Sequence, residues 1–296
     1  MPSPESVGSA VAAATDRLRT AGSPSARLDA EVLVAHVIET DRSWVIAHPE
    51  GPLSASAGEQ LGALVDRRAA GEPIAYIRGY KEWRSLRIRT DWRALIPRPE
   101  TELLVTAAVA DLERRLAHDG APIVAWEVAT GSGAVSIVLA RRFRSAISLG
   151  RIRLIASDVS PDALELASEN LADHGVQQLV TLACADLLEP AGSTLPMPDL
   201  VVANLPYVSS VDVDARRASL GYEPRLALDG GTDGLAVLRR LLIGLNASTA
   251  GGATVLLEIG VGQADEVAAL RPPGSTVAIV PDLAGLDRIV RVDLPD

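Results

Sequence analysis

The residues with the clearest chemical potential form the segment Asn204-Leu205-Pro206-Tyr207, which directly follows the apolar run PDLVVA. Such a run is typical of a buried strand, so the segment lies at the strand's carboxyl end, where open α/β sheets bind ligands. A side-chain amide and a nearby backbone carbonyl can together accept both hydrogens of an NH2 group, and a tyrosine ring can stack on a planar group. The segment therefore predicts a site that holds a planar nitrogen for reaction.

A second segment, WEVATGSGAVSIVLA, is typical of a strand, a glycine turn and a helix. Gly131 and Gly133 allow close approach of a ligand to the backbone, and the helix start offers free N–H groups. Ser136 occupies the place of the third glycine in G-x-G-x-x-G, and the G-K-[ST] ending of a phosphate loop is missing. A small adenosyl ligand without a phosphate is thus at least as plausible as a dinucleotide.

Two acids follow at the next strand ends. Asp158 ends the run RLIASD, where an acid can accept hydrogen bonds from both ribose hydroxyls. The alternative role is a helix cap, for which Ser160, immediately before a proline, is better placed. Asp186 could accept from the exocyclic amine of a base while Leu187 covers a ring face, or it could be a plain turn residue. These positions predict a nucleoside beside the amide of Asn204.

An alternating pattern must position these residues, and it begins at about residue 98. The expected strands are Ile123–Val128, Ile152–Ser157, Val180–Ala185, Leu200–Ala203, Thr254–Ile259, Ser275–Val280 and Ile289–Leu294. The expected helices are Glu100–Arg115, Ala134–Arg142, Pro161–His174, Gly234–Ala247 and Gln263–Leu270. This alternation predicts an α/β fold with a mostly parallel sheet covered on both faces.

The first quarter of the chain has a different pattern. Residues 1–75 carry apolar residues at intervals of three and four, which predicts a small helical domain. Residues 74–97 alternate apolar and polar positions around Gly79, which predicts two short strands and a hairpin linker over 76–97. That linker is the longest basic stretch of the chain and is either a solvated face or a contact surface for an acidic or backbone-rich partner. A third part, 98–296, then carries the chemistry.

Composition narrows the possible partners and location. A net charge of −10 and a pI near 5.0 argue against stable binding of nucleic acid through its phosphates, although a local basic patch is compatible with them. The sequence shows no signal-peptide pattern and no uncharged apolar stretch of about 18 residues, so we expect no membrane span. The single cysteine, Cys184, suits the cytoplasm and is expected to be buried on a strand. No metal site is expected.

At this point the chain resembles a known family. ANLPYV resembles the (N/D/S)-P-P-(Y/F/W) signature of S-adenosylmethionine-dependent methyltransferases that modify planar nitrogens. More narrowly, IPRPETELLV, EPRLALDGGTDGL, LLEIG and DLAGLDRIV resemble the HemK/PrmC family, and the likeness extends over nearly the whole chain. The resemblance implies a seven-stranded Rossmann-like domain that methylates the glutamine of the Gly-Gly-Gln motif in class 1 peptide chain release factors, in translation termination.

The resemblance also implies roles for individual residues. Catalysis is expected from Asn204, Pro206 and Tyr207, and substrate binding from these three with Leu205. S-adenosyl-L-methionine is expected to contact Glu127, Ala129, Thr130, Gly131, Ser132, Gly133, Asp158, Asp186, Leu187 and Asn204. The helical front domain is expected to recognise the substrate. Arg98 could form the lip of the cofactor site, and Glu223-Pro224-Arg225 could support the turn at Asn204.

Three positions depart from the family pattern. The family usually shows D-x-G-T-G-S-G, where this chain has Glu127 and Ala129 in place of the first acid and the first glycine. A methyl group at Ala129 could crowd the cofactor or force a backbone conformation that is costly without glycine. Leu205 replaces the first proline of N-P-P-Y, which is a mild change because Pro206 and Tyr207 remain. The departures concern the affinity for the cofactor more than the type of reaction.

Three other functions remain open at this point. An enzyme that methylates an amino nitrogen of a nucleic acid would use similar Asn-x-Pro-Tyr chemistry, and a closer variant would methylate a glutamine of a ribosomal protein. The third is a non-catalytic interaction protein that keeps the fold but has lost cofactor binding, with Ala129 as the mark of a degenerate loop.

Overall fold

A computed structural model describes residues 6–118, 120–189, 192–216 and 220–296. The chain divides into two compact units, Met1–Tyr80 and Lys81–Asp296. The first five residues of the predicted helical domain lie outside the described residues. In the parts of the chain that are described, every helix is too short or too polar to cross a membrane.

The first unit is helical, as its spacing of apolar residues predicts. It contains α1 (Val7–Thr20), α2 (Ala26–Val37), α3 (Arg42–Ala47), α4 (Ala55–Ala69) and α5 (Ile74–Arg78). Side chains of Ser6, Asp41 and Ser54 accept hydrogen bonds at the starts of α1, α3 and α4, so each of these helices has its own start signal. Apolar side chains of α1, α2 and α4 form one buried cluster.

The predicted hairpin is shorter than expected. Strands β1 (Tyr80–Trp83) and β2 (Leu86–Arg89) form a two-stranded sheet, but Ile74–Arg78 form helix α5, so the strand prediction for that stretch is wrong. Pro73 starts a single helical turn and Gly79, with φ of 75°, ends it, which the alternating apolar pattern concealed. Arg89 forms an ion pair with Asp173 of α9 (Pro161–Asp173), so part of the basic stretch is paired within the second unit.

The second unit contains the predicted seven-stranded sheet, with strand order β5-β4-β3-β6-β7-β9-β8. The strands are β3 (Ile123–Val128), β4 (Ile152–Asp158), β5 (Val180–Cys184), β6 (Leu200–Ala203), β7 (Thr254–Glu258), β8 (Thr276–Pro281) and β9 (Asp287–Asp293). Strands β3 to β7 pair in parallel, and β9 runs antiparallel to both β7 and β8. The strand order reverses between β3 and β6, and such a switch point is where open α/β sheets bind ligands.

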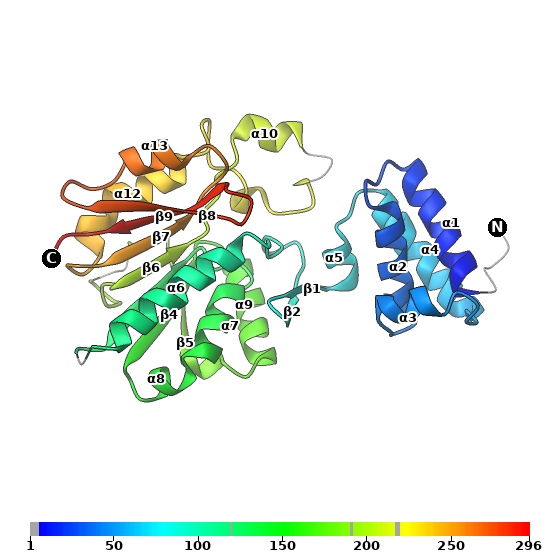
Figure 1. Ribbon diagram of the computed structural model, residues 1–296, viewed down its shortest axis with the longest axis horizontal. Helices are drawn as coiled ribbons and strands as arrows, with labels where there is room; N and C mark the ends of the chain where they lie inside the picture. Colours follow the sequence, from blue (N-terminus) through cyan, green and yellow to red (C-terminus); the bar gives the residue numbers. More distant parts are fainter. Residues whose placement is uncertain (1–5, 119, 190–191, 217–219) are drawn as a thin grey trace. The chain divides into compact units, whose positions relative to one another are not determined.

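Helices cover both faces of this sheet (Figure 1). One face packs against α6 (Thr101–Leu116) and α7 (Ala134–Arg142), and the other against α12 (Ala236–Ser248) and α13 (Ala264–Ala269). Leu200 and Val202 of β6 face the first cluster, whereas Val201 and Ala203 face the second. Burial on both faces explains why the central strands are continuous apolar runs.

The expected strands and the five expected helices are present with their ends shifted by at most two residues, α9 (Pro161–Asp173) among them. The sequence missed α8 (Arg144–Ser148), α10 (Ser210–Ala215) and two short 3₁₀ turns, Gln177–Leu179 and Arg225–Ala227. Cys184 is exposed, which contradicts the predicted buried thiol. It is the last residue of β5, which is an edge strand, so neighbours do not enclose it as they would in the sheet interior.

Candidate active site

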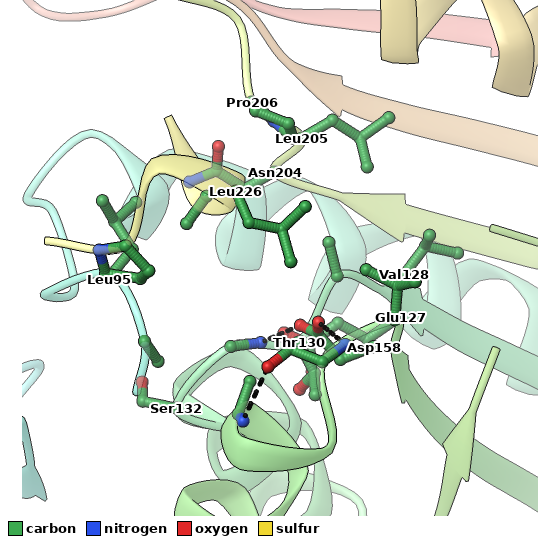
Figure 2. Close-up of a pocket in the computed structure, with 18 of the residues that line it drawn as sticks. Leu95, Glu127, Val128, Thr130, Ser132, Asp158, Asn204, Leu205, Pro206 and Leu226 are labelled. Atoms are coloured by element: carbon green, nitrogen blue, oxygen red, sulfur yellow. Dashed lines mark hydrogen bonds between the residues drawn. The ribbon is translucent and has the colours of Figure 1, made fainter. Parts of the chain in front are cut away.

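A cavity of about 380 Å³ opens at the carboxyl ends of β3, β4, β5 and β6. Figure 2 shows Asn204 and Leu226 on one side of it and Thr130 and Asp158 across from them. The predicted cofactor and substrate residues that line it are Glu127, Ala129, Thr130, Gly131, Ser132, Asp158, Asp186, Leu187, Asn204, Leu205 and Pro206. Gly133 and Tyr207 are not in its lining.

Glu127, the next-to-last residue of β3, bonds to the turn that follows this strand. Its carboxylate accepts hydrogen bonds from the Thr130 hydroxyl at 2.8 Å, from the backbone N–H of Ser136 at 2.9 Å and from the Ser136 hydroxyl. Burial raises the pKa of Glu127 to about 7, although these bonds from Ser136 and Thr130 lower it. The longer side chain at this position thus bonds both ends of the turn. Ser136, noted in the sequence only as a missing glycine, is one of its partners.

Ala129 has a φ of 57°, which is the left-handed conformation that the sequence analysis named as costly without glycine. This conformation costs an L-residue about 1–2 kcal/mol, so Ala129 holds local strain beside the cavity. Gly131 also has positive φ and lines the cavity. Gly133 has a different task, because a Cβ there would lie 3.2 Å from the Cβ of Ala167 in α9. Glycine at this position therefore permits helix packing, and it does not line the cavity.

Asp158 is buried in the cavity wall at the end of β4. One carboxylate oxygen accepts from the backbone N–H of Gly131 and the other from that of Ser160, both at 2.9 Å. Burial raises the pKa of Asp158, although its bonds to backbone N–H groups lower it. A carboxylate can accept about four hydrogen bonds, and three backbone N–H groups, those of Gly131, Val159 and Ser160, donate to this one. Ser160 caps α9, as predicted. Asp158 therefore ties the glycine turn to β4 and can still accept from a ligand.

Three arginines line the cavity, and each is paired with a carboxylate. Arg240 contacts Asp186 at 2.7 Å, Arg93 contacts Glu169 at 2.8 Å, and Arg98 contacts Glu223 at 2.5 Å. Asp186, the acid expected to lie beside the nucleobase of the ligand, is thus in an ion pair with Arg240. Because all three arginines of the cavity wall already have a carboxylate partner, they are less available to the phosphates of a ligand.

The turn after β6 positions Asn204. Its side-chain Nδ2 donates to the Thr101 hydroxyl at 3.1 Å, which leaves the amide oxygen Oδ1 as an acceptor at the cavity wall. Leu205 is buried in the core that α12 covers, so the leucine found in place of a proline is fixed by packing. Pro206 follows at the rim. The side-chain amide of Asn204 and the main chain of Leu205 and Pro206 thus line the same cavity.

Tyr207 is directed differently from the sequence prediction of stacking on substrate. Its hydroxyl lies 3.5 Å from an Oε1 of Glu258, and its backbone carbonyl accepts from Gln263 at 3.0 Å. Burial and the charge of Glu258 raise the pKa of Tyr207 to about 12, so the phenol stays protonated at neutral pH. In this structure Tyr207 contacts Glu258 at the end of β7 and does not line the cavity.

The glycines of the segment from Glu223 to Gly234 contact the turn after Asn204, whereas Glu223, expected to support that turn, contacts Ile96 and Arg98. The buried carboxylate of Glu223 accepts from the backbone N–H of Ile96 at 3.0 Å and pairs with Arg98, a residue of the cavity wall. A Cβ at Gly230 would lie 2.6 Å from the Pro206 carbonyl oxygen, and one at Gly234 would lie 2.4 Å from that of Tyr207. Only glycine fits at these two contacts.

Sequence reasoning missed two residues of this site, Thr101 and Glu258. Both lie in segments that were noted only for their resemblance, IPRPETELLV and LLEIG. The available signal was an acid at the carboxyl end of an otherwise apolar strand, since buried carboxylates are rare unless they have a role. The relevant contacts join residues far apart in the sequence, so spacing could not disclose them.

The fold and the site together define a methyltransferase of the Rossmann-like class. A solved methyltransferase from Pyrococcus furiosus shares this fold, with 16% identity, a TM-score of 0.50, and coverage of 78% of this chain and 98% of its own. Residues 9–79 match the model of the PrmC N-terminal domain.

The sequence relatives specify the family. A release factor glutamine methyltransferase from Moorella thermoacetica is 37% identical over 286 residues, covering 94% of this chain and 95% of the relative. One from Deinococcus radiodurans is 37% identical over 279 residues, with 94% and 95% covered. The chain belongs to the release factor glutamine methyltransferase family and is a methyltransferase enzyme, as the sequence motifs predicted.

Proposed function

We propose that this enzyme transfers a methyl group from S-adenosyl-L-methionine to the side-chain amide nitrogen of the glutamine in the Gly-Gly-Gln motif of class 1 peptide chain release factors, its partners in the cytoplasm. Relatives named for release factors and for glutamine support the substrate. The observation that carries the proposal is the fixed amide of Asn204, whose oxygen is available at the cavity while its nitrogen is held by Thr101.

The cavity supports the proposed cofactor. Its wall offers the buried carboxylates of Glu127 and Asp158 on the side of the glycine turn, and S-adenosylmethionine is a cation that they would favour. The pairing of its three arginines disfavours a dinucleotide with its phosphates. Contacts are proposed for Glu127, Ala129, Thr130, Gly131, Ser132, Asp158, Asp186, Leu187 and Asn204. Gly133 would act indirectly, through the packing of the turn on α9.

Methyl transfer to an amide nitrogen depends more on alignment of the reacting groups than on acid or base catalysis. An amide nitrogen is a poor nucleophile, and the bound cofactor supplies a methyl group that a sulfonium already activates. Asn204 Oδ1 and a main-chain carbonyl of Leu205 or Pro206 would accept the two N–H bonds of the substrate glutamine. They would hold its nitrogen in line and stabilise the positive charge that develops there as the new C–N bond forms and the methyl–sulfur bond breaks, which leaves a neutral thioether. The proton leaves the nitrogen afterwards, so no strong base is needed.

The proposed division of labour assigns substrate recognition to the helical residues 1–75, a linker to 76–97 and methyl transfer to 98–296. The match of residues 9–79 to the PrmC N-terminal domain supports a separate front domain. The compact units of the structure separate near the same place, at Tyr80.

Mass spectrometry of a recombinant class 1 release factor incubated with this enzyme and S-adenosylmethionine tests the proposal. One added methyl on the Gly-Gly-Gln glutamine is expected, and none on a release factor with asparagine at that position. Parallel incubations with RNA, DNA and ribosomal proteins test the other methyltransferase functions. Methylation of one of these, with the release factor unmodified, would overturn the proposed substrate. Calorimetry showing no binding of S-adenosylmethionine would instead indicate a degenerate cofactor site.

A further inference from the structure

Glu258 is an unusual residue for the end of a central strand. It is 1% exposed, at the carboxyl end of β7, beside the strand that leads to Asn204. Its Oε2 atom is buried without a hydrogen-bond partner among the described residues. Burial raises the pKa of Glu258 to about 7, although hydrogen bonds from the Thr101 and Tyr207 hydroxyls lower it. A buried carboxyl group is costly, which calls for a function.

Thr101 connects this carboxyl group to the catalytic amide. Its Oγ1 atom accepts a hydrogen bond from Nδ2 of Asn204 at 3.1 Å. A hydroxyl has a single hydrogen to donate, and the Thr101 hydroxyl lowers the pKa of Glu258, as a donor to that carboxyl group would. These observations fit a series that runs from the Asn204 amide to the Thr101 hydroxyl and from that hydroxyl to the Glu258 carboxylate.

We propose that Glu258 is a positioning residue that fixes the orientation of the Asn204 amide through the Thr101 hydroxyl. A carboxylate can only accept, so it requires the threonine to donate toward β7 and to accept from the NH2 group of Asn204. The amide oxygen must then face the substrate. A glutamine at 258 could donate instead, which would reverse the series and turn the Asn204 NH2 group toward the substrate NH2, where neither can accept from the other.

Two charged neighbours, Glu100 and Arg288, shift the pKa of Glu258 in opposite directions. Glu100 raises its pKa and Arg288 of β9 lowers it. Arg288 is itself held by Asp282 at 2.9 Å and lies 3.9 Å from Glu100. The segment DLAGLDRIV thereby brings its arginine to the acid behind the active site.

The inference rests on the proposed role of Asn204, and substitutions can test it separately. Glu258→Gln and Thr101→Val are each expected to lower kcat by about 10- to 100-fold, the scale of a misplaced reacting group. The KM for release factor and the Kd for S-adenosylmethionine should change by less than about threefold, because neither residue is proposed to bind them. Thr101→Ser keeps the hydroxyl and is expected to restore most of the activity.

Matched controls lie nearby: Thr106→Val, an exposed threonine on the same helix, and Glu266→Gln, an exposed glutamate on α13. Both should keep normal turnover. Thermal unfolding of every variant shows whether it is folded, and Thr101→Val tests the series even if Glu258→Gln fails to fold.

A double substitution separates positioning from general structural support. In an Asn204→Ala background, Glu258→Gln should cause no further loss of the single-turnover rate, because it acts only through Asn204. A further large loss would overturn the inference, as would normal kcat in Glu258→Gln. Normal turnover in Asn204→Ala alone would instead overturn the proposed role of Asn204, and an unmodified release factor with wild-type enzyme would overturn the proposed function.

Discussion

The two walls of the cavity are stabilised in different ways. On the wall formed by β3 and β4, Glu127 bonds to Thr130 and Ser136, three and nine residues away, and Asp158 bonds to Gly131, 27 residues away. On the wall formed by β6, Asn204 is held by Thr101 from 103 residues away, and Glu223 holds Ile96 from 127 residues away. Local contacts thus shape the proposed cofactor wall, and distant elements shape the proposed substrate wall.

This difference explains which departures from the family pattern are tolerated. On the cofactor wall, the departures Glu127 and Ala129 belong to the glycine-turn segment itself. Glu127 is accommodated by local hydrogen bonds, and Ala129 by a strained φ. On the substrate wall, Leu205 is fixed by the core beneath it. Substitutions on the first wall should therefore act on cofactor affinity, and those on the second on turnover.

The largest effect is expected at Asn204. Asn204→Ala removes the acceptor for the substrate N–H, and turnover should fall by about 100-fold or more, as on loss of one preorganised polar partner. Calorimetry should find S-adenosylmethionine binding within about threefold of normal, because the opposite wall is intact. Asn246→Ala, an exposed asparagine on α12, is the matched control. Near-normal turnover in Asn204→Ala would remove the distinction between the walls.

The cofactor wall should give the opposite result. Asp158→Ala is expected to raise the Kd for S-adenosylmethionine by about 10- to 100-fold, since a hydrogen bond to a charged group contributes about 1.5–3 kcal/mol. The value of kcat at saturating cofactor should stay within about threefold. Asp162→Ala, an exposed acid in the next helix, should bind normally in the same titration. Unchanged affinity in Asp158→Ala would exclude a direct contact with the cofactor.

Each wall contains one acid whose pKa is raised from 4.5 to about 7, Glu127 on the cofactor side and Glu258 on the substrate side. Between these pH values the folded state keeps a proton that the unfolded chain has lost. The free energy of unfolding should therefore fall as pH rises from about 4.5 to 7, by on the order of 1–3 kcal/mol per group.

Urea unfolding at a series of pH values measures this fall. Lowered carboxyl pKa values, as at Asp111, act in the opposite direction only at lower pH, around and below 3.8. Glu127→Gln and Glu258→Gln should each remove part of the slope, which compares the two walls directly. A stability that stays flat or rises across this window would contradict the prediction.

The smallest effect is expected at Ala129. Ala129→Gly relieves a left-handed residue, worth about 1–2 kcal/mol, but adds freedom to the unfolded chain worth about 0.4–1 kcal/mol. A net stabilisation of about 0.5 kcal/mol should appear as a slightly higher Tm, with cofactor affinity unchanged or modestly stronger. A loss of stability above about 1 kcal/mol would mean that the methyl group makes contacts that matter more than the strain.

The sequence by itself determined the α/β sheet, the edge of the sheet that carries the site, and the glycine turn, strand-end acids and amide of the cavity wall. Apolar runs, glycine turns and strand-end acids are local signals, and the hydrogen-bond partners of Glu127 and Asp158 lie within 27 residues of them in the sequence. The tertiary structure alone decided that Gly133 packs on a helix, that Tyr207 turns toward Glu258, and that Thr101 orients Asn204. Those contacts join chain segments 50 residues or more apart, or depend on how helices pack, so no spacing in the sequence encodes them.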